Sequence, residues 1–154
     1  MQRPARFLSI AAGTTALLAL VAAAPAEDGA AAFARRQDTM KHLGRPFYLG
    51  IGRVVKGTAP YGADTVSAAE TLASLAGTLD QTLFPPGSDV GESKIKPEIF
   101  AAKEQVDQLI AAVKAATARL VPAVKTGDKA AIAAAYASVN DACNGCHNQF
   151  RREE

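Results

Sequence analysis

Apolar side chains recur at steps of three and four residues in four segments of this 154-residue chain, and that spacing is the period of an amphipathic helix. We expect the first helix over residues 29–56 and the second over residues 64–83, with Asp64 as its N-cap. The third is expected over residues 97–124, and the fourth follows Asp128 and ends near residue 150. The pattern therefore predicts four successive helices.

Each segment carries its apolar residues on one face, which we expect to form the core. The inward residues of the first helix are expected to be Phe33, Gln37, Met40, Gly44, Phe47, Ile51 and Val54, and those of the second Val66, Ala69, Leu72, Ala76, Leu79 and Leu83. The third contributes Ile99, Ala102, Val106, Leu109, Val113, Leu120 and Val124, and the fourth Ile132, Tyr136, Val139, Cys143, Cys146 and Phe150.

Prolines and glycines mark the connections between the segments. Pro46 removes a backbone donor inside the first helix and is expected to kink it. Residues 84–96 contain two prolines and two glycines, which predicts a long surface crossing, and Pro97 suits a first helical position. Gly127 and Asp128 form a C-cap and N-cap pair. Short connections with one longer crossing predict an all-α protein, an antiparallel four-helix bundle.

The first 26 residues have the pattern of a secretory signal peptide. Arg3 and Arg6 form a basic start, residues 7–21 are almost entirely apolar, and Ala24 and Ala26 offer small residues for cleavage. An uncleaved anchor is the alternative, but the apolar run is shorter than the ~20 residues that span a bilayer. We therefore expect residues 1–26 to be removed, residues 27–154 to form one domain, and the mature protein to be periplasmic with no membrane span.

Charge and composition narrow the class of the mature chain. Removal of residues 1–26 takes away two arginines and no acid, which leaves 15 basic against 15 acidic residues. A neutral chain without a basic run has no electrostatic reason to bind nucleic acid, so we expect no such partner. Alanine dominates the mature sequence, and because alanine is the strongest helix former it supports the all-α class.

The fourth helix carries the clearest chemical signal. Cys143 and Cys146 are three residues apart and His147 follows directly, which is the C-x-x-C-H pattern of haem attachment. Residues three apart on a helix face the same way, so both sulfurs reach one edge of a porphyrin. The histidine then offers an imidazole nitrogen to iron. We therefore expect one covalently attached haem c per chain, with His147 as an iron ligand.

The two cysteines could also belong to a thiol–disulfide site or to a zinc site. A thiol–disulfide site favours a helix N-terminus, where the dipole lowers the thiol pKa, whereas this motif lies late in a helix. A zinc site needs four ligands, and His42 is the one further histidine that could complete the set with Cys143, Cys146 and His147. His42 is two residues from Met40, so it should point away from the inward stripe as a surface residue.

Four separate motifs resemble the class II c-type cytochromes, the family of cytochrome c′ and its low-spin relatives. Residues 143–151 match C-x-x-C-H-x-x-F-R, and residues 36–44 match R-Q-x-x-M-K followed by glycine. Between them lie the L-F-P element at residues 83–85 and Pro97, which opens the third helix. The resemblance covers essentially all of residues 27–154 and implies a four-helix haem domain.

The resemblance also implies roles for individual residues. Arg36 and Gln37 would lie at the haem edge, with Arg36 near a propionate, and Arg151 would cover the proximal side one turn after His147. A solvated Arg36 is the alternative. Phe150 is expected to be a core residue rather than a functional one.

The function that the resemblance implies depends on whether Met40 is an iron ligand. Met40 is the single methionine left after signal cleavage, and its local motif resembles the low-spin branch, in which the thioether is the sixth iron ligand. The leading expectation is therefore a one-electron carrier with redox partner proteins. The alternative is a five-coordinate haem that binds nitric oxide or carbon monoxide, with Met40 only packing above the iron.

Two further expectations concern catalysis and assembly. The mature sequence supplies no distal acid–base pair of the kind that a peroxidase needs, so we do not expect an enzyme. Members of the family are often antiparallel dimers through their first two helices. A homodimer is therefore an expectation that the sequence leaves open.

Overall fold

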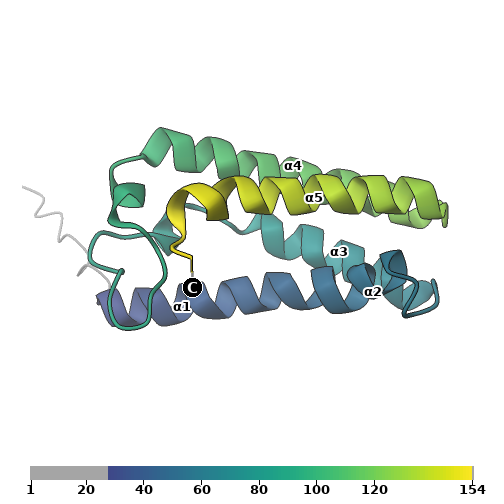
Figure 1. The fold of residues 1–154 in the computed structure, drawn as a ribbon, viewed down its shortest axis with the longest axis horizontal. Coiled ribbons are helices and arrows are strands. Elements are labelled where there is room, and N and C mark those ends of the chain that lie inside the picture. The colour runs from purple at the N-terminus through teal and green to yellow at the C-terminus, as the bar shows by residue number, and fades with distance from the viewer. Residues whose placement is uncertain (1–27, 154) are drawn as a thin grey trace, which may run out of the picture.

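The computed structural model describes residues 28–153, and the expected signal peptide at residues 1–26 lies outside them. The elements are α1 (Gly29–Gly44), a π-helix η1 (Arg45–Gly52), α2 (Arg53–Val55), α3 (Ala63–Gly77), the 3₁₀ turns η2 (Gln81–Leu83) and η3 (Pro97–Phe100), α4 (Lys103–Lys125) and α5 (Lys129–Phe150). The long helices follow the long axis of the molecule, and the crossing segment, residues 84–96, lies at the end that also holds the C-terminus (Figure 1). The all-α four-helix bundle is confirmed.

The first expected helix is one continuous rod that changes its hydrogen-bond pattern at Pro46. The α-helical ladder of α1 passes into η1 and then into α2, which ends at Val55. Because Pro46 has no N–H, the carbonyl one turn before it loses its α-helical donor, and a π-helix is one way in which the following residues re-pair. Eight residues of wider helix therefore begin at the position where the kink is expected.

The inward face of α1 differs from the predicted one. The buried residues of α1 are Ala32 and Arg36, whereas Gln37 is exposed and Met40 is half-buried. The pattern assigned inward positions to apolar side chains and so passed over an arginine that points into the protein. The prediction for Phe47 and Ile51 in η1 is confirmed, because both are buried.

The ends of the middle helices also differ from the prediction. Gly62, not Asp64, is the N-cap of α3, and its N–H donates to Thr65 Oγ1 at 3.3 Å. The helix ends at Gly77, so Leu83 reaches the core from a 3₁₀ turn. Pro97 likewise opens the 3₁₀ turn η3, and α4 begins only at Lys103.

The connection before α5 has the helix caps that the sequence predicts. Gly127 has a φ of +71°, a left-handed conformation that favours glycine. Asp128 is the N-cap, and its carboxylate accepts from the Ala130 N–H at 2.8 Å. Both parts of the expected cap pair are therefore confirmed.

Three apolar clusters fill the bundle. The central one lies among η1, α3, α4 and α5 and consists of Phe47, Ile51, Ala69, Leu72, Ala116, Leu120, Val124, Ile132 and Val139. The middle cluster consists of Ala76, Leu79, Leu83 and Val113, and the end cluster of Ile95, Ile99, Val106 and Phe150. Within residues 28–153, no helix is long and apolar enough to cross a membrane.

Small residues let η1 approach its neighbours closely. A Cβ added at Gly50 would lie 2.4 Å from the Cβ of Ala68 in α3, and one added at Gly52 would lie 2.8 Å from the Tyr136 hydroxyl. Phe47 stacks on Tyr136 with ring centroids 4.3 Å apart. The first and last helices of the bundle are thus joined through an aromatic pair, and α3 packs directly on η1.

We predict that Gly50→Ala destabilises the protein by about 1–3 kcal/mol, because overpacking forces the backbones of η1 and α3 apart. The measurement is the free energy of unfolding from denaturant titration. Gly77→Ala is the control, since a Cβ added there would meet nothing within 4 Å and helical alanine is favoured over glycine. Ala68→Gly should rescue the Gly50 variant; a Gly50→Ala protein as stable as the control would contradict the close approach.

Candidate functional site

The two cysteines lie on one face of α5 and are half-buried among apolar side chains. No disulfide joins them. Cys143 packs against the central and middle clusters, and Cys146 packs against the end cluster. Burial raises the pKa of both thiols, so neither lies in the electropositive surroundings that a reactive thiolate needs. This environment disfavours a thiol–disulfide site.

His147 follows on the last turn of α5. Its side chain is half-buried, and its carbonyl accepts from the Arg151 N–H at 2.9 Å, where the helix ends. Burial lowers the pKa of His147, and the charge of Arg151 lowers it further. A neutral imidazole is the form that binds a metal. Arg151 therefore lies close enough to act electrostatically on the expected iron ligand.

The chain directly after the motif is fastened to the crossing segment. The Lys96 N–H donates to the Phe150 carbonyl at 2.8 Å, and the Arg152 N–H donates to the Lys94 carbonyl at 2.7 Å. Ile95 and Arg151 form an isolated antiparallel bridge between them. Helical periodicity carries no signal for this pairing, because both strands of the bridge lie outside the helices. Phe150 is buried in the end cluster, as predicted.

Arg36 is the most unusual residue of the site, because its side chain is only 5% exposed. Nη1 donates to the Leu83 carbonyl at 3.0 Å and to Ser88 Oγ at 2.8 Å. Nη2 donates to the Ser88 carbonyl at 2.7 Å and to Ser93 Oγ at 3.0 Å. The alternative of a solvated arginine is wrong.

The surroundings of the Arg36 guanidinium are otherwise apolar. Its central carbon lies 5.8 Å from the ring centroids of both Phe33 and Phe84, a geometry suited to cation–π attraction. Burial lowers the Arg36 pKa, and the negative charge of Asp89 partly opposes that effect. The four oxygen acceptors all belong to residues 83–93, so Arg36 anchors the crossing segment. The propionate contact stays a prediction.

The other two α1 residues that were expected at the haem, Gln37 and Met40, differ in how far they are buried. Gln37 is exposed, and its side-chain oxygen accepts from Lys41 Nζ at 3.1 Å. Met40 is half-buried and belongs to none of the three clusters among residues 28–153. Leu43, one turn later, packs against the central and middle clusters, the same two that Cys143 contacts. Leu43 is therefore an α1 side chain that shares its surroundings with the motif, and helical periodicity did not single it out.

The zinc alternative finds no support in the described part of the chain. Within residues 28–153, no three His, Cys, Asp or Glu side chains gather in a way that could hold a metal ion. His42 is on the surface, as predicted, and its Nδ1 lies 3.2 Å from Asp38 Oδ2 with both side chains exposed. It is therefore not placed to complete a set with the residues of α5.

Haem c fits the residues that are present. Two cysteines on one helix face that are not joined by a disulfide suit thioether attachment, and burial lowers the pKa of the neighbouring His147, which favours its neutral form. Cys146 shares its apolar cluster with Phe84, Ile99 and Val106, which also line a cavity of about 210 Å³ beside the crossing segment. A macrocycle needs apolar contacts of this kind at its edge, and a metal ion alone does not.

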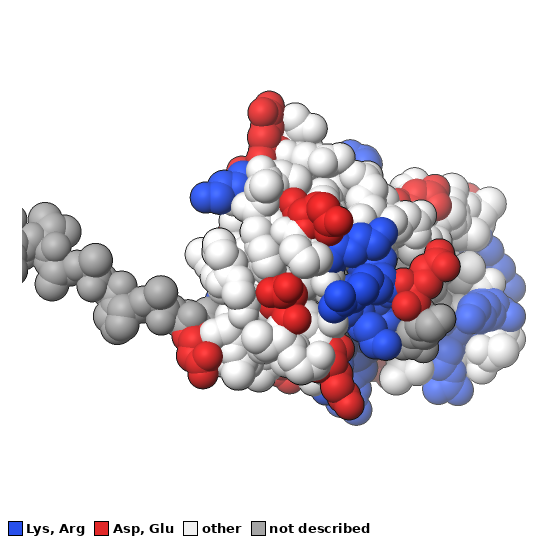
Figure 2. Space-filling view, turned by 60° about the vertical axis from the view of Figure 1, so that its left-hand side comes forward, with Lys and Arg blue, Asp and Glu red and all other residues white. Residues whose placement is uncertain are grey.

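Charge at this end of the molecule is mixed. Figure 2 shows a group of Lys and Arg side chains close together on one face, with Asp and Glu side chains around them. Lys94, Arg151 and Arg152 are exposed here, and the backbone pairing between residues 94–96 and 150–152 brings them together. This face is neither uniformly basic nor uniformly acidic.

Comparison with known proteins gives the same answer as the motif and the fold. The family model for cytochrome c′ matches residues 31–151. Cytochrome c′ of Rubrivivax gelatinosus is 33% identical over 117 residues, which cover 73% of this chain and 84% of the relative. Structures of cytochrome c′ from Alcaligenes xylosoxidans, with bound nitric oxide and with bound carbon monoxide, superpose with a TM-score of 0.72 at 27% and 28% identity.

Each of these two structures covers 82% of this chain and 98% of its own. A further cytochrome c′, described as having a ligand-controlled dimer dissociation, superposes with a TM-score of 0.73 at 25% identity over the same fractions. The likeness runs through the crossing segment and through the haem-attachment motif on α5. The chain therefore belongs to the cytochrome c′ family.

Proposed function

We propose that this protein binds a diatomic gas, nitric oxide or carbon monoxide, at a haem c joined to Cys143 and Cys146 with His147 as its protein ligand. The observation that carries the proposal is the position of Leu43. This side chain, which has no donor atom, shares the apolar clusters that Cys143 contacts, whereas Met40 lies outside them. Haem iron with one protein ligand supplies an open position for such a gas.

The solved relatives support this proposal over the electron carrier that the sequence analysis favours. The cytochrome c′ of Alcaligenes xylosoxidans is described with bound nitric oxide and with bound carbon monoxide. The chain's own residues would contribute an apolar surface on α1, a neutral imidazole on α5 and exclusion of water by the clusters around Cys143. None of these residues forms an acid–base pair, so we propose a binding protein rather than an enzyme.

A one-electron carrier is the second candidate, and the location of Met40 favours it. Met40 lies one turn before Leu43, so the two side chains share a face of α1. A thioether sulfur as second protein ligand would close the open position and raise the reduction potential. The low-spin assignment and the redox partner proteins belong to this candidate.

Covalent attachment is tested by extraction. Wild-type protein should keep its haem in acid–acetone, because two thioether bonds hold the haem. Cys143→Ser and Cys146→Ser should each retain it through one bond, and the double variant should release all of it. Intact mass measurement after extraction checks each case; a wild-type mass without haem would refute the site.

The two candidate functions differ in what happens at Met40 and Leu43. If the gas-binding proposal is right, the ferric protein is high-spin, the ferrous protein binds carbon monoxide, and Met40→Ala leaves the absorption spectrum unchanged. Leu43→Ala should then speed carbon monoxide binding, because it removes the side chain that shares the site. Spectra and stopped-flow kinetics measure both.

The electron carrier predicts the opposite pattern. Wild-type protein would be low-spin and closed to carbon monoxide, and Met40→Ala would convert it to a high-spin, gas-binding form with a lower potential. Leu75→Ala is the matched control, since it truncates a partly buried leucine of α3 that lies in none of the three clusters. That control should change neither spin state nor binding rate.

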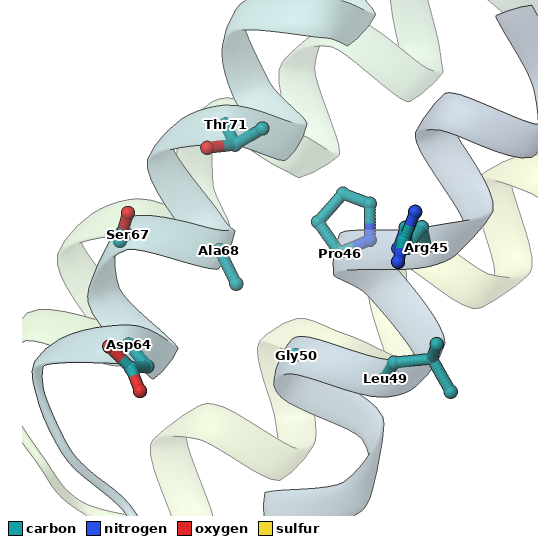
Figure 3. Close-up of a pocket in the computed structure, with 8 residues that line it drawn as sticks. All are labelled: Arg45, Pro46, Leu49, Gly50, Asp64, Ser67, Ala68 and Thr71. Atoms are coloured by element: carbon teal, nitrogen blue, oxygen red, sulfur yellow. The ribbon is translucent and has the colours of Figure 1, made fainter.

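We also propose a homodimer, formed through a groove of about 440 Å³ between η1 and α3. Pro46 and Ala68 point into this groove from opposite walls (Figure 3). Leu49 stands at its edge with 60% of its side chain exposed, a large apolar group for a solvent-facing position. Arg45 lines the η1 wall and Asp64 the α3 wall, so the surface carries both a projecting leucine and opposite charges.

A surface of this kind is complementary to itself. In a two-fold dimer, residue i of one protomer meets residue j of the other and the reverse contact follows by symmetry. Arg45 of each protomer would then meet Asp64 of its partner, and each Leu49 would enter the partner's groove. The relative described with a ligand-controlled dimer dissociation supports the proposal.

Sedimentation velocity tests the dimer. Arg45→Glu and Asp64→Arg should each raise the dimer dissociation constant, because each brings like charges together, and the double reversal should restore dimerisation. Arg53→Glu is the control, since Arg53 is exposed on α2 and does not line the groove. Equal weakening by the control, or a monomeric wild type, would refute this interface.

Export is the last part of the proposed function. Residues 1–26 carry the signal-peptide pattern, and we propose that the mature protein is periplasmic. The N-terminal sequence of protein recovered from a periplasmic fraction would test the cleavage after Ala26.

A further inference from the structure

Two hydrogen-bond networks from opposite ends of the chain meet at Ser93. Arg36, on α1, donates through Nη2 to the Ser93 hydroxyl at 3.0 Å. Arg152, directly after α5, donates through Nη2 to the Ser93 carbonyl at 2.7 Å. Ser93 is 3% exposed and Arg36 5%, so the contact between them is shielded from competing water, whereas Arg152 is exposed and its contact is half-buried. One residue of the crossing segment therefore links the first helix to the chain that follows the haem motif.

Backbone contacts strengthen this link on the α5 side. The Ile95 N–H donates to Ser93 Oγ at 3.4 Å, so the hydroxyl also shapes the turn that leads into the bridge with Arg151. The N–H groups of Lys96 and Arg152 complete the pairing on either side of that bridge. The Ser93 hydroxyl therefore contacts Arg36 and Ile95, and Ile95 lies between the two residues of the crossing segment that pair with the end of α5.

The link matters because α1 and α5 are supported by different neighbours. In the described chain, α5 packs mainly on α4, whereas α1 packs on η1, α3 and η2. At this end of the bundle, the C-terminal segment comes down from α5 toward α1 beside the crossing segment (Figure 1). Besides the Phe47–Tyr136 stack in the middle of the bundle, the separation between Leu43 or Met40 and His147 therefore depends on what ties these two helices together at this end.

We propose that Ser93 is a positioning residue of the haem site. Through Arg36 and Arg152 it sets the distance between α1 and the end of α5, and with it the room available on the gas-binding face. This inference rests on the proposed haem function. The hydrogen bonds of Ser93 reach neither His147 nor the cysteines, so its effect is exerted through the crossing segment.

Two buried serines of the crossing segment allow a matched experiment. Ser88 is also fully buried, and its hydroxyl also accepts from Arg36, at 2.8 Å, but its hydrogen bonds do not reach the C-terminal segment. Ser88→Ala and Ser93→Ala each remove one hydroxyl acceptor from Arg36, which keeps its other three acceptors. Ser93→Thr keeps the hydroxyl and should behave as wild type.

The first readout does not depend on haem chemistry. In the holoprotein, Ser93→Ala removes the hydroxyl that accepts from the charged Arg36 and from the Ile95 N–H. Amide hydrogen exchange at Lys96 and Arg152, which flank the bridge formed by Ile95, should then become about tenfold faster, the change expected for the loss of a hydrogen bond to a charged group. Ser88→Ala should leave exchange at these two amides unchanged, although both variants lower the free energy of unfolding. Equal exchange in Ser88→Ala and Ser93→Ala would overturn the special place of Ser93.

The second readout separates positioning from a merely structural role. Ser93→Ala should change the rate of carbon monoxide binding to the ferrous protein by at least about threefold, whereas Ser88→Ala and Ser93→Thr should not. An unchanged rate together with faster exchange would overturn the positioning role while leaving the gas-binding function intact.

A wild-type protein that fails to bind carbon monoxide would instead refute the proposed function. In that case the ferric absorption spectrum decides the role of Ser93. A shift toward high spin in Ser93→Ala alone supports positioning of Met40, and an unchanged spectrum overturns it.

Discussion

Burial of a guanidinium costs free energy unless its N–H groups are donated to oxygens, and this constraint governs the end of the bundle where the haem site lies. The Arg36 guanidinium donates to hydroxyl and carbonyl oxygens of residues 83–93, and two aromatic rings lie beside it. No helix fixes the path of the crossing segment between η2 and η3, and its two glycines, Gly87 and Gly91, have positive φ. The buried charge therefore selects the path, and the path in turn receives the chain that follows the motif.

The helices and the haem motif could be predicted from the sequence because both depend on local spacing. Three-residue spacing fixes Cys143 and Cys146 on one helix face, and a glycine followed by aspartate marks the start of α5 regardless of the rest of the fold. The family was evident from the same short motifs. These features need no knowledge of which segments meet in space.

The predictions from the sequence were wrong where the position of a side chain depends on contacts with residues distant in the sequence. Periodicity assigned Gln37 to the core and gave no sign that Arg36 is buried, because the oxygens that stabilise the arginine lie about fifty residues away. Leu43 was overlooked for the same reason, since its importance comes from clusters that also include α3 and α4. Whether Met40 approaches the iron is also a question about two helices, and periodicity describes one at a time.

The widened turns of η1 have a consequence for the evolution of the family. The ladder of a π-helix is one residue looser than that of an α-helix, so deletion of a single residue between Arg45 and Gly52 would restore α-helical pairing. Each residue of a π-helix turns the chain less than a residue of an α-helix, so the tighter winding largely offsets the lost residue and α1 keeps nearly the same facing. Arg36 and Met40 would then stay on their present sides. Homologous sequences should therefore include chains that are one residue shorter in this segment and α-helical throughout it.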